Sequence, residues 1–332
     1  MNKVPTIYEV AQVSKVSITT VSRFMNNPDK VAPKTRLKIE QAMKELDFTP
    51  KADAVARARQ GSRRIGILIP FLTAQSFVER LEGVHTTLRS EGYEIVTYLV
   101  DTQRQLQGYL SMLPVSGRID GLIIMALPFG DEDVENFKRH NIPIVGIEVE
   151  HRDVSSITID DVFGGELAAS YLIGKGYRQC AFIGEGGEPP YSLHATGLRL
   201  KGFQKKLEVL GYPMDEDHIC FHPYGMEASI SCTKALISRK YRPDAIFCGS
   251  DFQAIGVIKA ARALHIRIPE DIGLLGFDDT MIAGYMDIST IRQSLVRSGE
   301  MAAGMVIDHL KDSGNPVIHT QLELNVVERL TT

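Results

Sequence analysis

The chain of 332 residues contains no tryptophan and only four cysteines. Without tryptophan, an aromatic platform for a ligand has to come from phenylalanine or tyrosine. The cysteines, at 180, 220, 232 and 248, show neither CxxC spacing nor the pattern of a disulfide framework. We therefore expect reduced, mostly buried thiols, as in a cytoplasmic protein.

Long apolar runs are also missing. No stretch approaches the roughly 20 apolar residues that cross a bilayer, and no signal sequence precedes the first helical pattern. The chain has no GxSxG, HExxH or P-loop motif and no Ser/His/Asp order. We expect a cytoplasmic protein without membrane contact, without a cofactor or metal, and without enzymatic activity.

Two short patterns resemble ligand sites and are set aside. The sequence GEGGEPPY at 184–191 lacks the spacing of a dinucleotide loop, and its prolines block a helix start. His218, Cys220 and His222 are close in sequence, but packed or solvated side chains explain them better than a metal. We assign neither a nucleotide nor a metal to these positions.

Residues 6–26, TIYEVAQVSKVSITTVSRFMN, predict a helix-turn-helix. Thr6 caps the first helix and Glu9 closes its capping box, while Ser17 caps the second helix after a short turn. An ordinary helical hairpin is the alternative. A third helix beginning at Pro33 favours a three-helix DNA-binding head instead.

The second helix of this head has two distinct faces. Val21 and Phe24 fall on its inner face, and Ile18, Thr19 and Arg23 point outward. The N-terminal half of a recognition helix reaches base edges in the major groove from this position. Charge agrees, because residues 1–64 hold 13 of the 37 lysines and arginines but only 6 of the 41 acidic residues. A solvated basic face is the alternative.

From residue 64 onward, short Ile- and Val-rich runs alternate with helical segments. This alternation predicts parallel sheets with helices on both faces, in which ligands bind beyond the carboxyl ends of the strands. The predicted strands are 63–70, 93–100, 121–127, 143–149, 179–184, 245–249 and 272–278.

Motifs along nearly the whole chain resemble the LacI/GalR family of bacterial transcriptional regulators. They include TIYEVAQ, VSITTVSRFMN, PIVGIE, ITIDD, RLKGF, SDFQAIG and IPEDIGLLGFDDT, in this order. The resemblance implies an all-α helix-turn-helix head followed by α/β, two doubly wound parallel-sheet subdomains of periplasmic-binding-protein type. The implied parts are a head at 1–48, a hinge at 49–63, an N-subdomain at 64–161 and 293–322, and a C-subdomain at 162–292 and 323–332.

The resemblance also implies how the head meets DNA. Ile18, Thr19 and Arg23 would read bases, and Ser17, Thr20 and Ser22 would hold phosphates. Thr6 is a further candidate for contact with DNA. The partner would be a near-palindromic double-stranded operator bound by a homodimer, and the regulator a repressor rather than an activator. The implied dimer surface runs along TLRSEGY and the apolar stripe of 298–311, a stripe that core packing would equally explain.

Three positions depart from the family. Lys15 stands where the turn usually has glycine, so we expect a left-handed backbone there. Ala32 replaces the serine that caps the third helix. The hinge lacks the leucine that wedges between base pairs, and we hypothesise that Arg57 or Arg59 enters the narrow minor groove instead.

The resemblance places a small effector, expected to be a sugar, between the subdomains. Arg199 of RLKGF and Asp278 of GFDD would grip it, since a guanidinium fork beside a carboxylate suits vicinal hydroxyls. A structural ion-pair network is the alternative. Other candidates are Glu148, Ser250 and Asp251 at strand ends, and Phe77, Phe163 and Phe221 as apolar faces, although phenylalanine is usually core.

Other effectors and other protein classes stay open at this point. A nucleoside, a purine or a protein partner would also suit a regulator of this family. A solute receptor would carry a signal peptide and no basic head. A sugar-metabolising enzyme would need an acid and base at the pocket, for which Asp278 and Asp279 are weak candidates.

Overall fold

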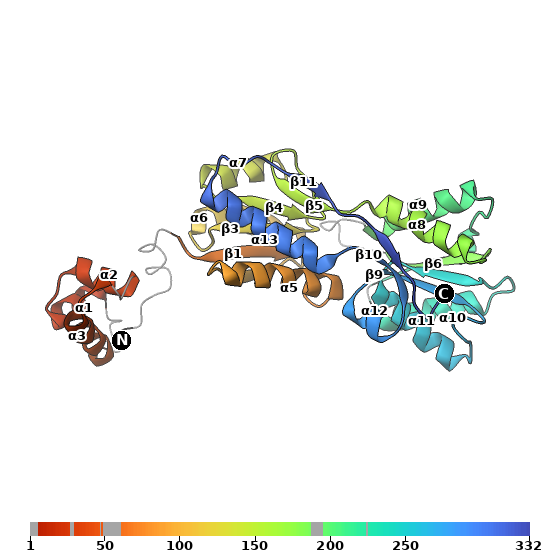
Figure 1. The fold of residues 1–332 in the computed structure, drawn as a ribbon, viewed down its shortest axis with the longest axis horizontal. Helices are drawn as coiled ribbons and strands as arrows, with labels where there is room; N and C mark the ends of the chain where they lie inside the picture. Colours follow the sequence, from red (N-terminus) through yellow and green to blue (C-terminus); the bar gives the residue numbers. More distant parts are fainter. Residues whose placement is uncertain (1–5, 27–29, 47, 49–60, 187–194, 224) are drawn as a thin grey trace.

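The computed structural model describes residues 6–26, 30–46, 48, 61–186, 195–223 and 225–332. The first part is a head of three helices around one small core (Figure 1). Its helices are α1 (Ile7–Ser14), α2 (Ile18–Asn26) and α3 (Pro33–Glu45). Its buried side chains are Val10, Ala11, Val21, Phe24, Val31, Ile39 and Ala42.

The predicted helix ends of the head are confirmed. The Glu9 carboxylate accepts hydrogen bonds from the backbone N–H and the hydroxyl of Thr6, at 2.7 and 3.0 Å. The Ser17 hydroxyl accepts from the backbone N–H of the third residue beyond it, at 3.1 Å. Lys15 is left-handed, with φ 56° and ψ 39°. Ala32 precedes α3 without a side-chain cap. The head therefore forms through local rules, with two departures that each cost about 1 kcal/mol.

The N-subdomain is a six-stranded sheet with the order β11-β5-β4-β3-β1-β2, in which every pair is parallel. Helices α6 and α7 cover one face, and α5 and α13 cover the other. The strands are β1 (Arg64–Ile69), β2 (Glu94–Leu99), β3 (Gly121–Met125), β4 (Ile144–Ile147), β5 (Ser155–Thr158) and β11 (His319–Gln321). The helices are α5 (Gln75–Ser90), α6 (Gln103–Ser116), α7 (Asp131–Arg139) and α13 (Leu295–Lys311).

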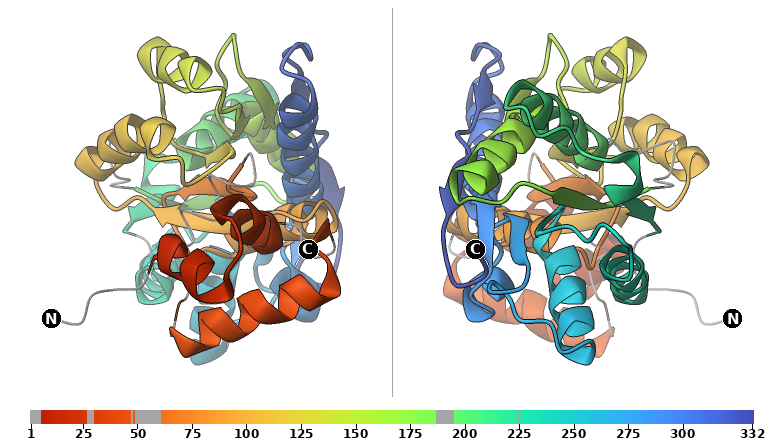
Figure 2. Two further views of the ribbon diagram at one scale, coloured as in Figure 1. Left: turned by 90° about the vertical axis from the view of Figure 1, so that its left-hand side faces the viewer. Right: turned by 90° about the vertical axis from the view of Figure 1, so that its right-hand side faces the viewer.

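The C-subdomain repeats this plan with the order β12-β10-β9-β8-β6-β7. Only β12 runs antiparallel to its neighbour, β10. Helices α8 and α9 cover one face, and α10 and α11 the other (Figure 2). The strands are β6 (Cys180–Glu185), β7 (Ile219–His222), β8 (Ala245–Cys248), β9 (Gly273–Asp278), β10 (Ser289–Arg292) and β12 (Asn325–Val327). The helices are α8 (Asp161–Gly174), α9 (Ala195–Val209), α10 (Met226–Ile237), α11 (Asp251–Ala263) and α12 (Met281–Tyr285), and Glu216–His218 form one 3-10 turn, η2.

The chain passes between the two sheets three times. It crosses after β5, again between β10 and α13, and finally between β11 and β12 (Figure 1). Segments from both ends of the chain thus contribute to each subdomain. Two doubly wound sheets joined in this way leave their carboxyl strand ends facing a common space, where ligands of such folds bind.

Glycines allow close helix packing on one face of each sheet. A Cβ on Gly299 of α13 would overlap the carbonyl oxygen of Arg80 in α5. In the other subdomain, a Cβ on Gly165 of α8 would overlap the carbonyl oxygen of Arg199 in α9. The two arginines therefore each lie where a pair of helices makes backbone contact.

The start of the body is fastened to the N-subdomain. The Asp120 carboxylate accepts hydrogen bonds from the backbone N–H of Ser62 and of Arg63, at 2.6 and 2.7 Å, and from the Ser62 hydroxyl, at 2.8 Å. Asp120 directly precedes β3, a central strand. Its three bonds fix the chain just before β1.

The expectation of four reduced cysteines is wrong for one pair. Cys220 of β7 and Cys232 of α10 form a disulfide, with their Cα atoms 6.0 Å apart. The pair is made by α10 folding back onto β7, which a search for short cysteine spacing does not detect. Cys180 and Cys248 are free and buried, and burial raises the pKa of the Cys180 thiol to about 12. Within the described part of the chain, no helix has the length and apolar character needed to cross a membrane.

Candidate functional site

A cleft of about 850 Å³ lies at the carboxyl strand ends of the two sheets. Residues that follow β1, β3 and β4 line it from the N-subdomain, and residues that follow β6, β8 and β9 line it from the C-subdomain. It also receives the first turns of α5, α8 and α9. Neither subdomain alone encloses the cleft, so a bound molecule would contact both.

Arg199 is the best-anchored side chain of the cleft. It is 6% exposed, and its Nε donates to Oδ1 of Asp161 at 2.8 Å. Its Nη1 donates to the carbonyl oxygen of Gly249 at 2.6 Å and lies 3.6 Å from Oδ1 of Asp278. The guanidinium carbon lies 3.6 Å from the centroid of the Phe277 ring. These contacts fix the plane of the guanidinium before any ligand binds.

A second chain of polar contacts joins the subdomains. Arg80 on α5 donates through Nη2 to Oε1 of Glu148 at 2.9 Å and to Oε1 of Gln293 at 2.8 Å. The amide nitrogen of Gln293 donates in turn to Oδ1 of Asp278. Gln293 lies at the second crossing between the sheets. The network thus connects Arg80 and Glu148 of the N-subdomain to the carboxylate of Asp278 at the end of β9.

Burial dominates the acid–base properties of these carboxyl groups. It raises the pKa of Glu148 to about 7, opposed by the Arg80 charge. It raises the pKa of Asp278 to about 6, opposed by the Arg199 charge. Asp278 also has a backbone φ of 116°, which is unusual for a residue other than glycine. Strained backbone and displaced pKa values often mark functional sites.

The structure brings together most of the predicted effector residues. Phe77, Glu148, Arg199, Ser250 and Asp278 all line the cleft. Ser250 also caps α11, because its hydroxyl accepts from the N–H of the residue three positions on. Arg199 and Asp278 lie close to each other within the protein and also line the cleft. Both a ligand-binding role and a structural ion-pair network therefore stay open for them.

Three of the predicted effector residues do not line the cleft. Asp251 is fully buried, and its carboxylate accepts from the backbone and hydroxyl of Thr280 and from the hydroxyl of Thr290. Burial, with a further effect of the Asp278 charge, raises its pKa to about 8. Phe163 and Phe221 are 48% and 45% exposed and are not among the described residues that line the cleft. For these three residues, direct contact with an effector stays a prediction.

Several cleft residues escaped the sequence analysis. Arg80, Asp161 and Gln293 line the cleft and take part in its polar network. Arg80 occupies the buried face of α5 together with Phe77 and Val84. A charged residue on the apolar face of a helix was the signal that could have revealed it.

The same geometry argues against an acid–base pair for catalysis. Oδ2 of Asp279 pairs with Nε of Arg292, and Oδ1 pairs with Nη2 of Arg329, both at 2.6 Å. Asp279 therefore links Arg292 of β10 to Arg329, which follows β12, and both of its carboxylate oxygens are already in ion pairs.

In the head, the predicted base-reading side chains are exposed. Ile18 is 43% exposed, and Thr19 and Arg23 also face solvent. The Ser17 hydroxyl lies 2.8 Å from the Thr20 hydroxyl, at the N-terminus of α2. Thr6 is exposed and bonded to Glu9. The side chain of Ser22, and both Arg57 and Arg59, fall outside what the structure describes.

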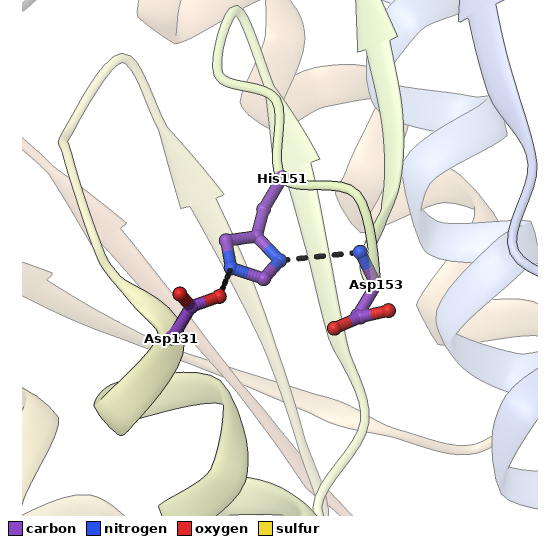
Figure 3. A group of neighbouring side chains, drawn as sticks. All are labelled: Asp131, His151 and Asp153. Carbon is purple, nitrogen blue, oxygen red and sulfur yellow. Dashed lines mark hydrogen bonds and ion pairs between the residues drawn. The ribbon is translucent and has the colours of Figure 1, made fainter.

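One cluster outside the cleft contains three residues whose side chains can bind a metal ion. Asp131, His151 and Asp153 bring one ligand atom each to within 4.8 Å of one another (Figure 3). Nε2 of His151 lies 3.0 Å from Oδ1 of Asp131, and the backbone N–H of Asp153 donates to Nδ1 at 3.2 Å. Arg152 also pairs with Asp131. Both imidazole nitrogens are thus already in hydrogen bonds, so the cluster is explained by the protein alone.

Family comparisons cover both parts of the chain. The family described as bacterial regulatory proteins, lacI family, matches residues 6–51. A periplasmic binding protein-like domain matches residues 169–332. Two solved structures show the same fold along the whole length: a LacI-family regulator from Silicibacter pomeroyi and the lac repressor dimer bound to operator and an anti-inducer. The first has 24% identity, a TM-score of 0.83 and coverage of 98% of this chain and 99% of that one. The second has 24% identity, a TM-score of 0.77 and coverage of 99% of both chains.

Curated relatives are more similar in sequence. The transcriptional repressor PurR of Proteus mirabilis is 32% identical over 333 residues, which cover 98% of this chain and 96% of that protein. PurR of Yersinia pestis is 32% identical over 335 residues, with the same coverage. These relatives are repressors with a helix-turn-helix, not enzymes, in agreement with the prediction from the sequence. The chain belongs to the lacI family of bacterial regulatory proteins.

Proposed function

We propose that this DNA-binding repressor acts as a homodimer on a near-palindromic operator and is controlled by a small molecule held between its subdomains. The observation that carries the proposal is the buried Arg199, which is held by fixed contacts in the lining of a cleft that both sheets build. A ligand that binds this cleft in one arrangement of the subdomains shifts the population toward that arrangement. Operator and effector then affect each other's binding by the same factor.

The head supports the DNA part of the proposal. Ile18, Thr19 and Arg23 project from α2 away from the head core. We assign base reading to these side chains and phosphate contacts to Thr6, Ser17, Thr20 and Ser22. A single head of three short helices offers little surface, so two heads of a dimer are needed for specific binding. Arg57 and Arg59 remain hypotheses for the minor groove.

The surface of α13 supports a dimer only in part. Val306 is fully buried in the N-subdomain core, so one edge of the predicted stripe belongs to the core. Met301, Met305 and Leu310 are half-buried beside it and keep some of their surface exposed. We propose that this exposed edge, with residues 87–93, contacts the second copy.

We propose a sugar as the effector. The pairing of Arg199 with Asp161 and Asp278 offers a donor fork beside carboxylate acceptors, the pattern that vicinal hydroxyls match. Structural relatives include the regulator CelR in complex with cellobiose, at 23% identity and a TM-score of 0.70, covering 99% of this chain and 100% of that chain. The relatives with higher sequence identity are PurR repressors, and we keep a nucleoside or purine as the second candidate.

The test combines ligand binding with DNA binding. The purified protein is melted with sugars, nucleosides and purines, because a ligand at a hundred times its Kd adds about 2.7 kcal/mol of stability. A compound that shifts the melt is then added to the protein on its operator. The proposal requires that the compound changes operator affinity and that Arg199→Ala abolishes the shift. A bound compound that leaves operator affinity unchanged would refute the control mechanism.

A further inference from the structure

The described lining of the cleft is unbalanced in charge. It contains two arginines, Arg80 and Arg199, and neither lysine nor histidine among the described residues. Its acidic side chains outnumber them three to one and are Glu148, Glu150, Asp160, Asp161, Glu185 and Asp278. The interior of the cleft therefore carries a surplus of carboxylates.

Both guanidinium groups are neutralised within the protein. Nη2 of Arg80 lies 2.9 Å from Oε1 of Glu148. Nε of Arg199 lies 2.8 Å from Oδ1 of Asp161, and its Nη1 lies 3.6 Å from Oδ1 of Asp278. All of these side chains are at most 16% exposed. Among the described residues of the lining, no cation is left without a carboxylate partner for a phosphate or carboxylate of a ligand, and the surplus acids would repel an anion at low dielectric.

The free polar atoms of this network include both acceptors and donors. In each of its three carboxylates, the contacts with described residues use one oxygen: Oε1 of Glu148, Oδ1 of Asp161 and Oδ1 of Asp278. The second oxygen of each has no hydrogen bond to a described residue. On the donor side, Nε of Arg80 is buried without an acceptor. Nη1 of Arg80 and Nη2 of Arg199 likewise have no hydrogen bond to a described residue. A ligand that satisfies these atoms must supply both O–H donors and acceptors.

We propose that the cleft selects an uncharged, hydroxyl-rich effector and excludes the phosphorylated or carboxylated forms of the same compound. This inference rests on the function proposed above and adds the charge class of its ligand. A hydroxyl group donates to one free carboxylate oxygen and accepts from the free Nε of Arg80. A phosphate or carboxylate supplies acceptors only, so the buried oxygens lose water without gaining a donor. Sites built on buried polar partners reject ligands that leave those partners unpaired.

The test uses matched pairs that differ only in charge. Titration calorimetry on the full-length protein compares ribose with ribose 5-phosphate, glucose with glucose 6-phosphate and glucuronate, and adenosine with its 5′-monophosphate. The uncharged member of the pair that binds is expected to bind at least tenfold more tightly than its anionic partner. A phosphorylated or carboxylated member that binds as tightly as its parent, or more tightly, overturns the inference. The proposed function survives that result, because it fails only when a bound compound leaves operator affinity unchanged.

A pair of variants tests whether the selection comes from local charge. Glu150 is exposed at the cleft and accepts from the Thr158 hydroxyl at 3.2 Å, which a glutamine oxygen can also do. Glu150→Gln is expected to lower the preference for the uncharged member by about twofold to fivefold, from the weaker repulsion near the surface. Glu132→Gln, on the exposed start of α7 outside the cleft, is the control and leaves the ratio unchanged. Equal effects of both variants would contradict local selection.

Discussion

Replacing Gly165 with alanine tests whether the α8–α9 contact positions Arg199, the arginine that we propose binds the effector. The added Cβ would overlap the carbonyl oxygen of Arg199 and lie 2.6 Å from the backbone nitrogen of Phe203. Overpacking of this kind costs about 1–3 kcal/mol, and the better helix propensity of alanine returns up to about 1 kcal/mol. We expect a net loss of about 1–2 kcal/mol, and at roughly 2–4 °C per kcal/mol the melting temperature falls by about 2–8 °C.

The matched control lies on the same helix. Gly174→Ala places its Cβ where no heavy atom lies within 4 Å, so we expect no loss and a gain of at most about 1 kcal/mol. Both variants are melted without ligand, and effector affinity is then measured by calorimetry. Because any movement of α9 displaces Arg199, only Gly165→Ala should weaken effector binding. The reasoning is refuted if the two variants melt within 1 °C of each other and bind effector equally.

Other expected outcomes concern charge, DNA and the disulfide. Arg199→Met removes the cation from two buried carboxylates and should lower the free energy of unfolding by about 3–5 kcal/mol. Urea unfolding should show a smaller loss of this free energy at pH 5 than at pH 8, and a loss that does not depend on pH would contradict the reasoning. The folded pKa of Glu148, about 7, exceeds its ordinary value of 4.5, so its stabilising contribution is complete below pH 4.5 and disappears as the pH rises through 7. Glu148→Gln should therefore lose less stability than the parent between pH 5 and 8 in the same assay. Arg23→Ala should weaken operator binding by about 1–3 kcal/mol in fluorescence anisotropy and flatten the preference over unrelated DNA; an unchanged preference would exclude base reading. Cys220→Ser should lower the stability by about 3 kcal/mol under oxidising conditions, with no difference from the parent once both are reduced.

The head and the long strands could be predicted because their signals are local. A capping box, a turn and an apolar face lie within a few residues of one another. The strands β1, β3, β6 and β9 are five- or six-residue apolar runs that are almost wholly buried. Short strands were missed for the opposite reason. β5 reads SSIT and β10 reads STIR, and neither contains enough apolar residues to stand out from a loop.

The central cleft residues were predicted only where they belong to a recognisable sequence motif. Arg199 and Asp278 belong to sequence motifs, whereas Arg80 acquires its role from Glu148 and Gln293, which lie 68 and 213 positions away. Pairings over such separations depend on the crossing of the two sheets and leave no mark in local sequence. Asp251 shows the converse, because a strand-end carboxylate faces two buried threonine hydroxyls and not the cleft.

The hydrogen bonds of Asp120 to Ser62 and Arg63 fix the point at which the chain joins the N-subdomain after the DNA-binding head. They fasten Ser62 and Arg63 to the N-subdomain, so these residues move together with it. Loss of the carboxylate in Asp120→Asn or Asp120→Ala would release residues 61–63, and three extended residues add at most about 10 Å of reach. This added reach is about a third of one helical turn of DNA, and a dimer has two such segments. A single half-buried carboxylate just before β3 would thereby decide how strictly the protein measures the distance between two operator half-sites.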